Sequence, residues 1–156
     1  MNLHYRSLLL AAVPGLLVQT LFGLINIRIS QELLDAVPTG LMAVASSLVC
    51  VLSIFADAGV GGLYAFFHSR SLALSTVDGA VGGVAATALA RIGSSVIGSF
   101  INLAAAAGKG AAADQLSTAI AGSVIGLCLA ATIGIVPGAF GGWLSASMIA
   151  RRQGHS

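Results

Sequence analysis

The sequence predicts an all-α integral membrane protein, a four-helix bundle that forms a single transmembrane domain over residues 1–156. Hydrophobic residues make up 57% of the chain and charged residues only 8%, whereas a soluble domain carries roughly a quarter charged residues. Four apolar stretches each exceed the ~20 residues that cross a hydrocarbon core. None of them alternates apolar and polar residues as the strands of a membrane barrel do.

The four predicted helices cover residues 7–27, 41–67, 76–107 and 118–150. Each is expected to be helical because backbone amides in lipid need hydrogen-bond partners within their own segment. The first stretch lacks a small-x-small cleavage site after its apolar run, so we expect a retained helix rather than a signal peptide.

Residues 29–37, after the first stretch, fit two interpretations. They form either an amphipathic helix in the outer interface or a continuation of the first helix, which Pro38 then ends. The outer ends of the third and fourth stretches are also long and polar. We therefore favour the continuation, and with it helices that extend past the outer face.

The charges between the apolar stretches predict the orientation. One side collects Arg6, Arg70, Arg151 and Arg152, and the other collects Arg28 and Lys109. Cytoplasmic segments carry an excess of Lys and Arg. The termini and the second loop are therefore expected to lie in the cytoplasm, with the protein in the cytoplasmic (inner) membrane.

A row of small residues follows one face of the fourth predicted helix. Steps of four residues connect Gly122, Gly126, Ala130, Gly134, Gly138 and Gly142. Helices in lipid associate by close backbone approach, which such small-xxx-small rows permit. The row predicts glycine-zipper packing, in a groove that is filled either from within the bundle or by another subunit, a lipid tail or a pigment.

Three glycine-containing motifs carry a resemblance to a broader group of proteins. They are Gly61–Ala65 (GGLYA), Asp78–Gly83 (DGAVGG) and Gly138–Gly142 (GAFGG). Over roughly residues 56–150 the chain resembles small glycine-rich four-pass bacterial membrane proteins of unknown function. The resemblance implies the architecture and no activity.

Three ionisable residues fall within the apolar stretches, where a charge costs a few kcal/mol and indicates a functional site by default. At ~1.5 Å per residue, Asp57 lies about 20 Å, Asp78 about 10 Å and Arg91 nearly 30 Å above the inner boundary. Asp57 is either protonated or bonded to a neighbouring helix, or it is a proton or cation site. Arg91 either snorkels outward or reaches down toward Asp57. Asp78 is expected near the inner interface.

The remaining polar residues offer little chemistry. His68 is expected to be an interfacial anchor, with ligation of a pigment or haem as the alternative. Cys50 and Cys128 have no metal-ligand spacing and are expected to be free thiols. We expect no metal site, no cofactor apart from a bound lipid or pigment, no nucleic-acid partner and no enzymatic activity.

Two functions fit these observations better than a third, an intramembrane enzyme. The first is a non-catalytic structural or accessory subunit, which packs through its small-residue grooves against a larger membrane complex or against itself. The second is a small channel or transporter for an ion, a proton or a solute, in which Asp57, Asp78 and Arg91 line a polar path. The sequence favours the first, with the lipid bilayer and other membrane subunits as partners.

Overall fold

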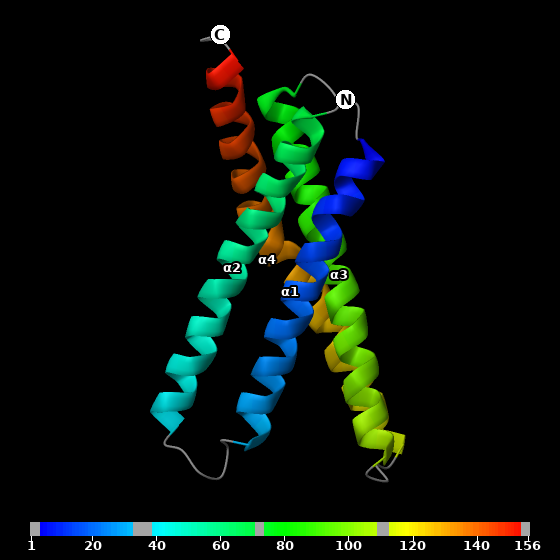
Figure 1. Ribbon diagram of the computed structural model, residues 1–156. Coiled ribbons are helices and arrows are strands. Elements are labelled where there is room, and N and C mark those ends of the chain that lie inside the picture. Colours follow the sequence, from blue (N-terminus) through cyan, green and yellow to red (C-terminus); the bar gives the residue numbers. More distant parts are fainter. Residues whose placement is uncertain (1–3, 33–38, 71–73, 109–112, 154–156) are drawn as a thin grey trace.

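Four long helices make up the described part of the structure, a computed structural model (Figure 1). It describes residues 4–32, 39–70, 74–108 and 113–153, and their side chains except those of 26–32, 39–40, 42–43, 46, 106, 113–131 and 153. The helices are α1 (Tyr5–Glu32), α2 (Thr39–Ser69), α3 (Thr76–Gly108) and α4 (Ala113–Gln153). No strand occurs in these residues, so the prediction of an all-α fold with four long apolar helices is confirmed.

The end of α1 concerns the two interpretations of residues 29–37, which follow the first apolar stretch. α1 continues without a break through Ile29 to Glu32, as the continuation interpretation expects for these residues. Residues 33–38, where Pro38 was expected to end the helix, lie outside the described residues.

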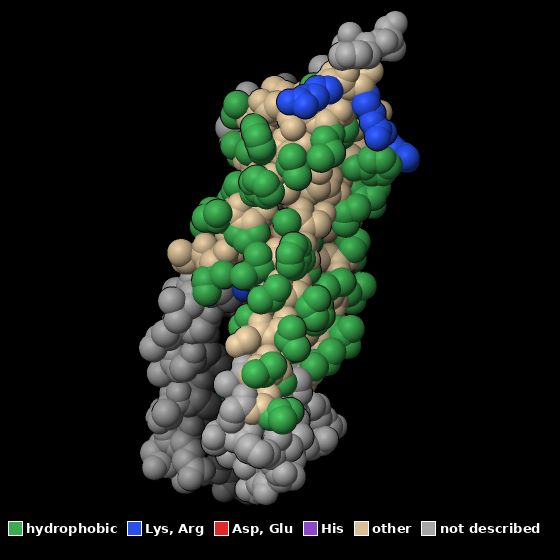
Figure 2. Space-filling view, turned by 90° about the vertical axis from the view of Figure 1, so that its left-hand side faces the viewer, with side chains coloured by type: hydrophobic (Ala, Val, Ile, Leu, Met, Phe, Trp, Pro, Cys, Tyr) green, Lys and Arg blue, Asp and Glu red, His purple; other side chains and the backbone are tan. Residues whose placement is uncertain are grey.

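All four helices are long and apolar enough to cross a membrane, over Tyr5–Ile25, Ser47–Ser69, Thr76–Ala105 and Thr132–Arg152. Large apolar side chains on their surfaces are exposed, for example Phe55 (70%), Phe100 (68%) and Val136 (73%). Figure 2 shows hydrophobic side chains spread over the visible face and most of the visible Lys and Arg side chains toward one end. Soluble monomers rarely expose so continuous an apolar surface, and these helices therefore indicate a membrane protein in contact with lipid.

The helices form two antiparallel pairs that cross. Among the described residues α1 packs against α2 and α3, and α4 packs against α2 and α3, whereas α1 and α4 do not meet. The start of α1 and the end of α4 lie at the same end of the molecule, which we call the terminal end (Figure 1). Toward the opposite end, called the far end, the α1–α2 pair diverges from the α3–α4 pair.

Glycines bring α2, α3 and α4 together in the half near the terminal end. A Cβ atom added to Gly61 of α2 would collide with the Gly138 carbonyl and the Gly142 amide of α4. Gly83 of α3 likewise faces the Gly138 carbonyl, and Gly79 faces that of Gly142. Three helix backbones therefore touch directly, which a side chain at any of these positions would prevent.

The far half is more open. A Cβ atom added to Gly15 of α1 would meet Val60 and Ala90, but one added to Gly23, two turns further along, has nothing within 4 Å. On α3, Gly93 faces Leu16, whereas Gly98 again has nothing within 4 Å. Along α1 the close contacts therefore end between Gly15 and Gly23, at the level of Gln19, whereas among the described side chains those of α3 continue as far as Gly93, just beyond Arg91.

Candidate functional site

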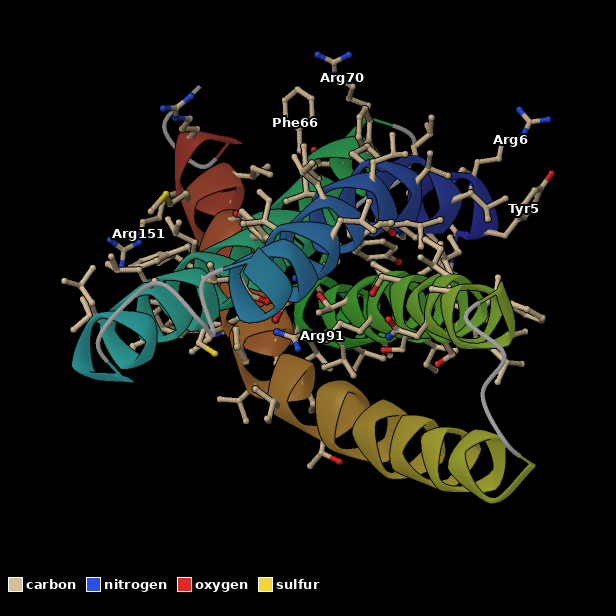
Figure 3. All side chains as sticks on the ribbon, turned by 90° about the horizontal axis from the view of Figure 1, so that it is seen from below. Tyr5, Arg6, Phe66, Arg70, Arg91 and Arg151 are labelled. Atoms are coloured by element: carbon tan, nitrogen blue, oxygen red, sulfur yellow. The ribbon has the colours of Figure 1, made fainter. Side chains whose placement is uncertain are left out.

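An ion pair between α2 and α3 lies at the centre of the structure. The side chain of Asp57 is fully buried, and that of Arg91 is 12% exposed. Arg91 Nε donates to Asp57 Oδ2 at 2.8 Å, and Arg91 Nη2 donates to the same oxygen. Figure 3 shows Arg91 among the helices, whereas Arg6, Arg70 and Arg151 lie around the edge of the molecule.

Both partners lie near the middle of their helices. At ~1.5 Å per residue, Asp57 is about 18 Å from Ser69, at the end of its span, and Arg91 is about 22 Å from Thr76, at the start of its span. The nearly 30 Å height expected for Arg91 is counted from an inner boundary beside Arg70, before α3 begins, and it stays a prediction. The Arg91 side chain covers the small difference between these two distances and reaches inward to Asp57 rather than snorkelling outward.

Two further polar side chains close a ring of hydrogen bonds around the pair. Gln19 of α1 donates from Nε2 to Asp57 Oδ1 at 2.7 Å. Ser53 of α2 donates to Gln19 Oε1 at 2.9 Å and accepts from Arg91 Nη2 at 3.0 Å. We call Gln19, Ser53, Asp57 and Arg91 the central network. It carries no net charge when both ionisable groups are charged, and it joins three helices.

Over its described side chains, residues 132–152, the fourth helix gives the network space through its glycines. A Cβ atom on Gly134 of α4 would lie 2.8 Å from Arg91 Cδ, and one on Gly138 would lie 2.8 Å from Thr87 Cβ. Thr87 Oγ1 in turn donates to the Asp57 backbone carbonyl at 3.3 Å. At these positions, and at Gly142, the small-residue row is covered from within the chain. The side-chain surroundings of Gly122, Gly126 and Ala130 lie outside the described residues.

Further polar residues lie between the central network and the far end of the molecule. On α3, Ser95, Ser99 and Asn102 follow Arg91 at helical spacing on one face. The two serines are half-buried and Asn102 is exposed. Thr20 of α1, beside Gln19, has a buried hydroxyl without a hydrogen-bond partner in the described part of the chain. A buried polar atom of this kind commonly has an ordered water or a ligand as its partner.

Asp78, the third ionisable candidate, lies apart from the network. Its carboxylate accepts from Ser75 Oγ at 2.7 Å, and its backbone amide donates to that hydroxyl at 3.0 Å. Ser75 directly precedes α3, so its hydroxyl caps the start of that helix, and Asp78 accepts a hydrogen bond from the capping hydroxyl. The structure thus brings Asp57 and Arg91 together and gives Asp78 a local role at the terminal end.

A second polar group lies near the terminal end, formed by His4, Ser7, Tyr64 and His68. Tyr64 Oη and His68 Nδ1 are 3.1 Å apart, and His4 Nδ1 and Ser7 Oγ are 3.0 Å apart. The rings of His4 and His68 meet edge to face at 6.1 Å between centroids. His68 is only 1% exposed, and its ring lies against those of Tyr64 and His4. That it anchors the protein at the interface, as expected from its place beside Arg70, stays a prediction.

The described residues hold no group of three or more His, Cys, Asp or Glu side chains that could bind a metal ion. Cys50 is an exposed free thiol, as expected, and Cys128 lies outside the described side chains. The central network therefore provides a guanidinium and a carboxylate that form hydrogen bonds in a low-dielectric interior.

Comparison with known proteins gives no matching family model, no matching curated protein and no matching solved structure.

Proposed function

We propose that this chain is a small membrane channel or transporter whose central network binds the ion or solute that passes. The observation that carries this proposal is the Asp57–Arg91 pair, which is buried near the middle of the apolar spans of α2 and α3. Charges in a membrane interior are costly, and they most often mark a substrate or ion pathway. The polar face of α3 supplies a route from the far end to Arg91.

A purely structural pair explains these features less well. The backbone contacts among Gly61, Gly83 and Gly138 already hold three helices together. A buried ion pair is weak evidence for stability, because apolar side chains of similar size often replace such a pair without loss. The Arg91 side chain also keeps some exposure, 12%.

Flux through reconstituted vesicles tests this proposal. We expect purified protein to conduct at least one of a panel of protons, small cations and small anions. The double variant Asp57→Asn/Arg91→Gln removes both charges without leaving one unpaired, and its flux is expected to fall to the level of protein-free vesicles. Asp78→Asn is the matched control, because it removes a carboxylate outside the central network, and it is expected to keep flux. A folded double variant with normal flux would exclude the network as the pathway.

The second candidate is a non-catalytic accessory subunit, favoured by the glycine row of α4. We propose that the row packs as a glycine zipper, with Gly134, Gly138 and Gly142 filled from within. We propose that a partner binds along the rest of the row, at Gly122, Gly126 and Ala130. Extraction in a mild detergent separates the candidates, since co-migration with other polypeptides in fixed ratio supports the accessory subunit and migration alone supports the transporter.

We also propose that the terminal end faces the cytoplasm, in the inner membrane. Arg6, Arg70, Arg151 and Arg152 belong to the helix ends or adjoining residues there, as the positive-inside rule requires. A fluorescent protein fused after Ser156 is expected to be bright, and alkaline phosphatase fused at the same place is expected to be inactive. An active phosphatase fusion would reverse the orientation.

A further inference from the structure

We propose that the central network binds a small carboxylate anion and takes up one proton with it, so that the protein is a proton–carboxylate cotransporter. This inference rests on the proposed transport function and names the substrate class for the same site. Asp57 is the proton acceptor, and the guanidinium of Arg91 is the anion-binding group.

The charge balance of the site requires the proton. The central network is neutral while Asp57 and Arg91 are both charged, so an added anion would leave a net negative charge in the membrane interior, where isolated charges are costly. Arginine cannot release or gain a proton to compensate. Protonation of Asp57 restores neutrality, because the cation of Arg91 then pairs with the bound anion.

No other described group near the pair can take up the proton. α1 presents Gln19 to the carboxylate and α2 presents Ser53. α3 presents Thr87 beside Arg91, and α4 presents the glycines Gly134 and Gly138. Of the described side chains that contact the pair, none besides Asp57 and Arg91 is ionisable. Proton uptake on anion binding therefore falls to Asp57.

An incoming ligand would reach Arg91 before it reaches Asp57. Asp57 has no exposed side-chain surface, whereas Arg91 retains 12%, and the polar face of α3 leads to it from the far end. Arg91 uses Nε and Nη2 for Asp57 and Ser53. Its Nη1 donates no hydrogen bond to any residue of the described part of the chain. An anion can meet Nη1 first and then replace Asp57 at the other donors.

The contacts of Asp57 also indicate which anion fits. A carboxylate already occupies the donors of Arg91, and guanidinium matches a planar carboxylate through parallel hydrogen bonds better than it matches a spherical ion. In the exchange, a hydronium ion from the aqueous phase gives its proton to an Asp57 oxygen and leaves as water, and the ion pair passes from Asp57 to the ligand carboxylate. No carbon bond changes. The protonated Asp57 then donates a hydrogen bond, which Gln19 Oε1 accepts once the Gln19 amide turns over, because Nε2 faces Asp57 while the carboxylate is ionised.

Titration calorimetry with lactate tests this inference on the purified full-length protein. The same titration in two buffers of different ionisation enthalpy reports the protons taken up. We expect about one proton per lactate bound, and an affinity that weakens about tenfold for each unit of rising pH while Asp57 is ionised in the free protein. Chloride is expected to bind much more weakly. Binding without proton uptake, or equal affinity for chloride, would overturn the inference.

Asp57→Asn gives the sharpest variant, because it fixes this position in a neutral form. We expect it to bind lactate without proton uptake, independently of pH, and to be protected by lactate against thermal unfolding. Loss of binding in a folded Asp57→Asn protein would contradict the exchange of partners at Arg91. If this variant does not fold, Arg91→Lys, which keeps the charge but loses the planar fork, is expected to bind lactate more weakly with the proton count unchanged.

The outcome separates this inference from the proposed function. Proton-coupled lactate binding without flux in vesicles would support the ligand class and defeat the transport proposal. Flux of another ion that depends on the Asp57–Arg91 pair, without lactate binding, would support transport and defeat the carboxylate assignment.

Discussion

Asp57→Asn is expected to destabilise the protein by about 3–5 kcal/mol, which is the usual range when one partner of a buried ion pair is removed. The reason is the charge that remains. Arg91 keeps its proton under all ordinary conditions, and its side chain is held between α3 and α4 by the contact with Gly134. It would therefore remain as an unpaired cation near the middle of the membrane.

The partner variant Arg91→Gln is expected to cost less, because a lone Asp57 can take up a proton and become neutral. The double variant Asp57→Asn/Arg91→Gln is expected to cost least, since amides can hydrogen-bond with Gln19 and Ser53 without any charge. Unfolding by a denaturing detergent in mixed micelles, at neutral pH and without added anion, measures all three. If the two single variants lose the same stability, hydrogen bonding rather than the unpaired charge determines the loss of stability.

Gly61→Ala is expected to destabilise the protein by about 1–3 kcal/mol, the typical effect of overpacking a well-packed interior. The added methyl group would collide with the backbone of α4 at Gly138 and Gly142. These are backbone atoms, so no side chain can rotate away to make room. α2 and α4 must instead move apart, which would also disturb the contact between Gly83 and Gly138.

Gly59→Ala is the matched control on the same helix. A Cβ atom at Gly59 has no atom within 4 Å, and alanine is favoured over glycine inside a helix by up to about 1 kcal/mol. We expect this variant to be as stable as the wild type or slightly more stable in the same mixed-micelle assay. Similar losses at both positions would show that the close approach at Gly61 does not support the fold.

The helices were predictable from composition because the bilayer allows so few solutions. An apolar run of this length must satisfy its own backbone hydrogen bonds, and each predicted helix is present. The residues at which the helices begin were predicted less accurately. α1 begins at Tyr5 rather than Ser7, and α4 begins at Ala113 rather than Thr118, because helices continue through polar residues once the chain leaves the apolar stretch.

The candidate site was predictable only in part. Asp57 and Arg91 stand out because ionisable residues are rare in apolar segments. Ser53 precedes Asp57 by one helical turn, and Thr87 precedes Arg91 in the same way, so a search for polar residues at this spacing would have found both. Gln19 has no such signal, because its role depends on how α1 crosses α2, and a pattern within one helix does not contain that crossing.

The ion pair also bears on how the chain enters the membrane during synthesis. Asp57 belongs to α2 and Arg91 to α3, so the acid leaves the ribosome before its counter-ion does. It must enter lipid as the neutral acid or wait in a hydrated environment beside the insertion machinery until α3 follows. Pairing of the two charges then joins the first helical hairpin to the second. α4 is synthesised last, and its glycines pack against helices that are already paired.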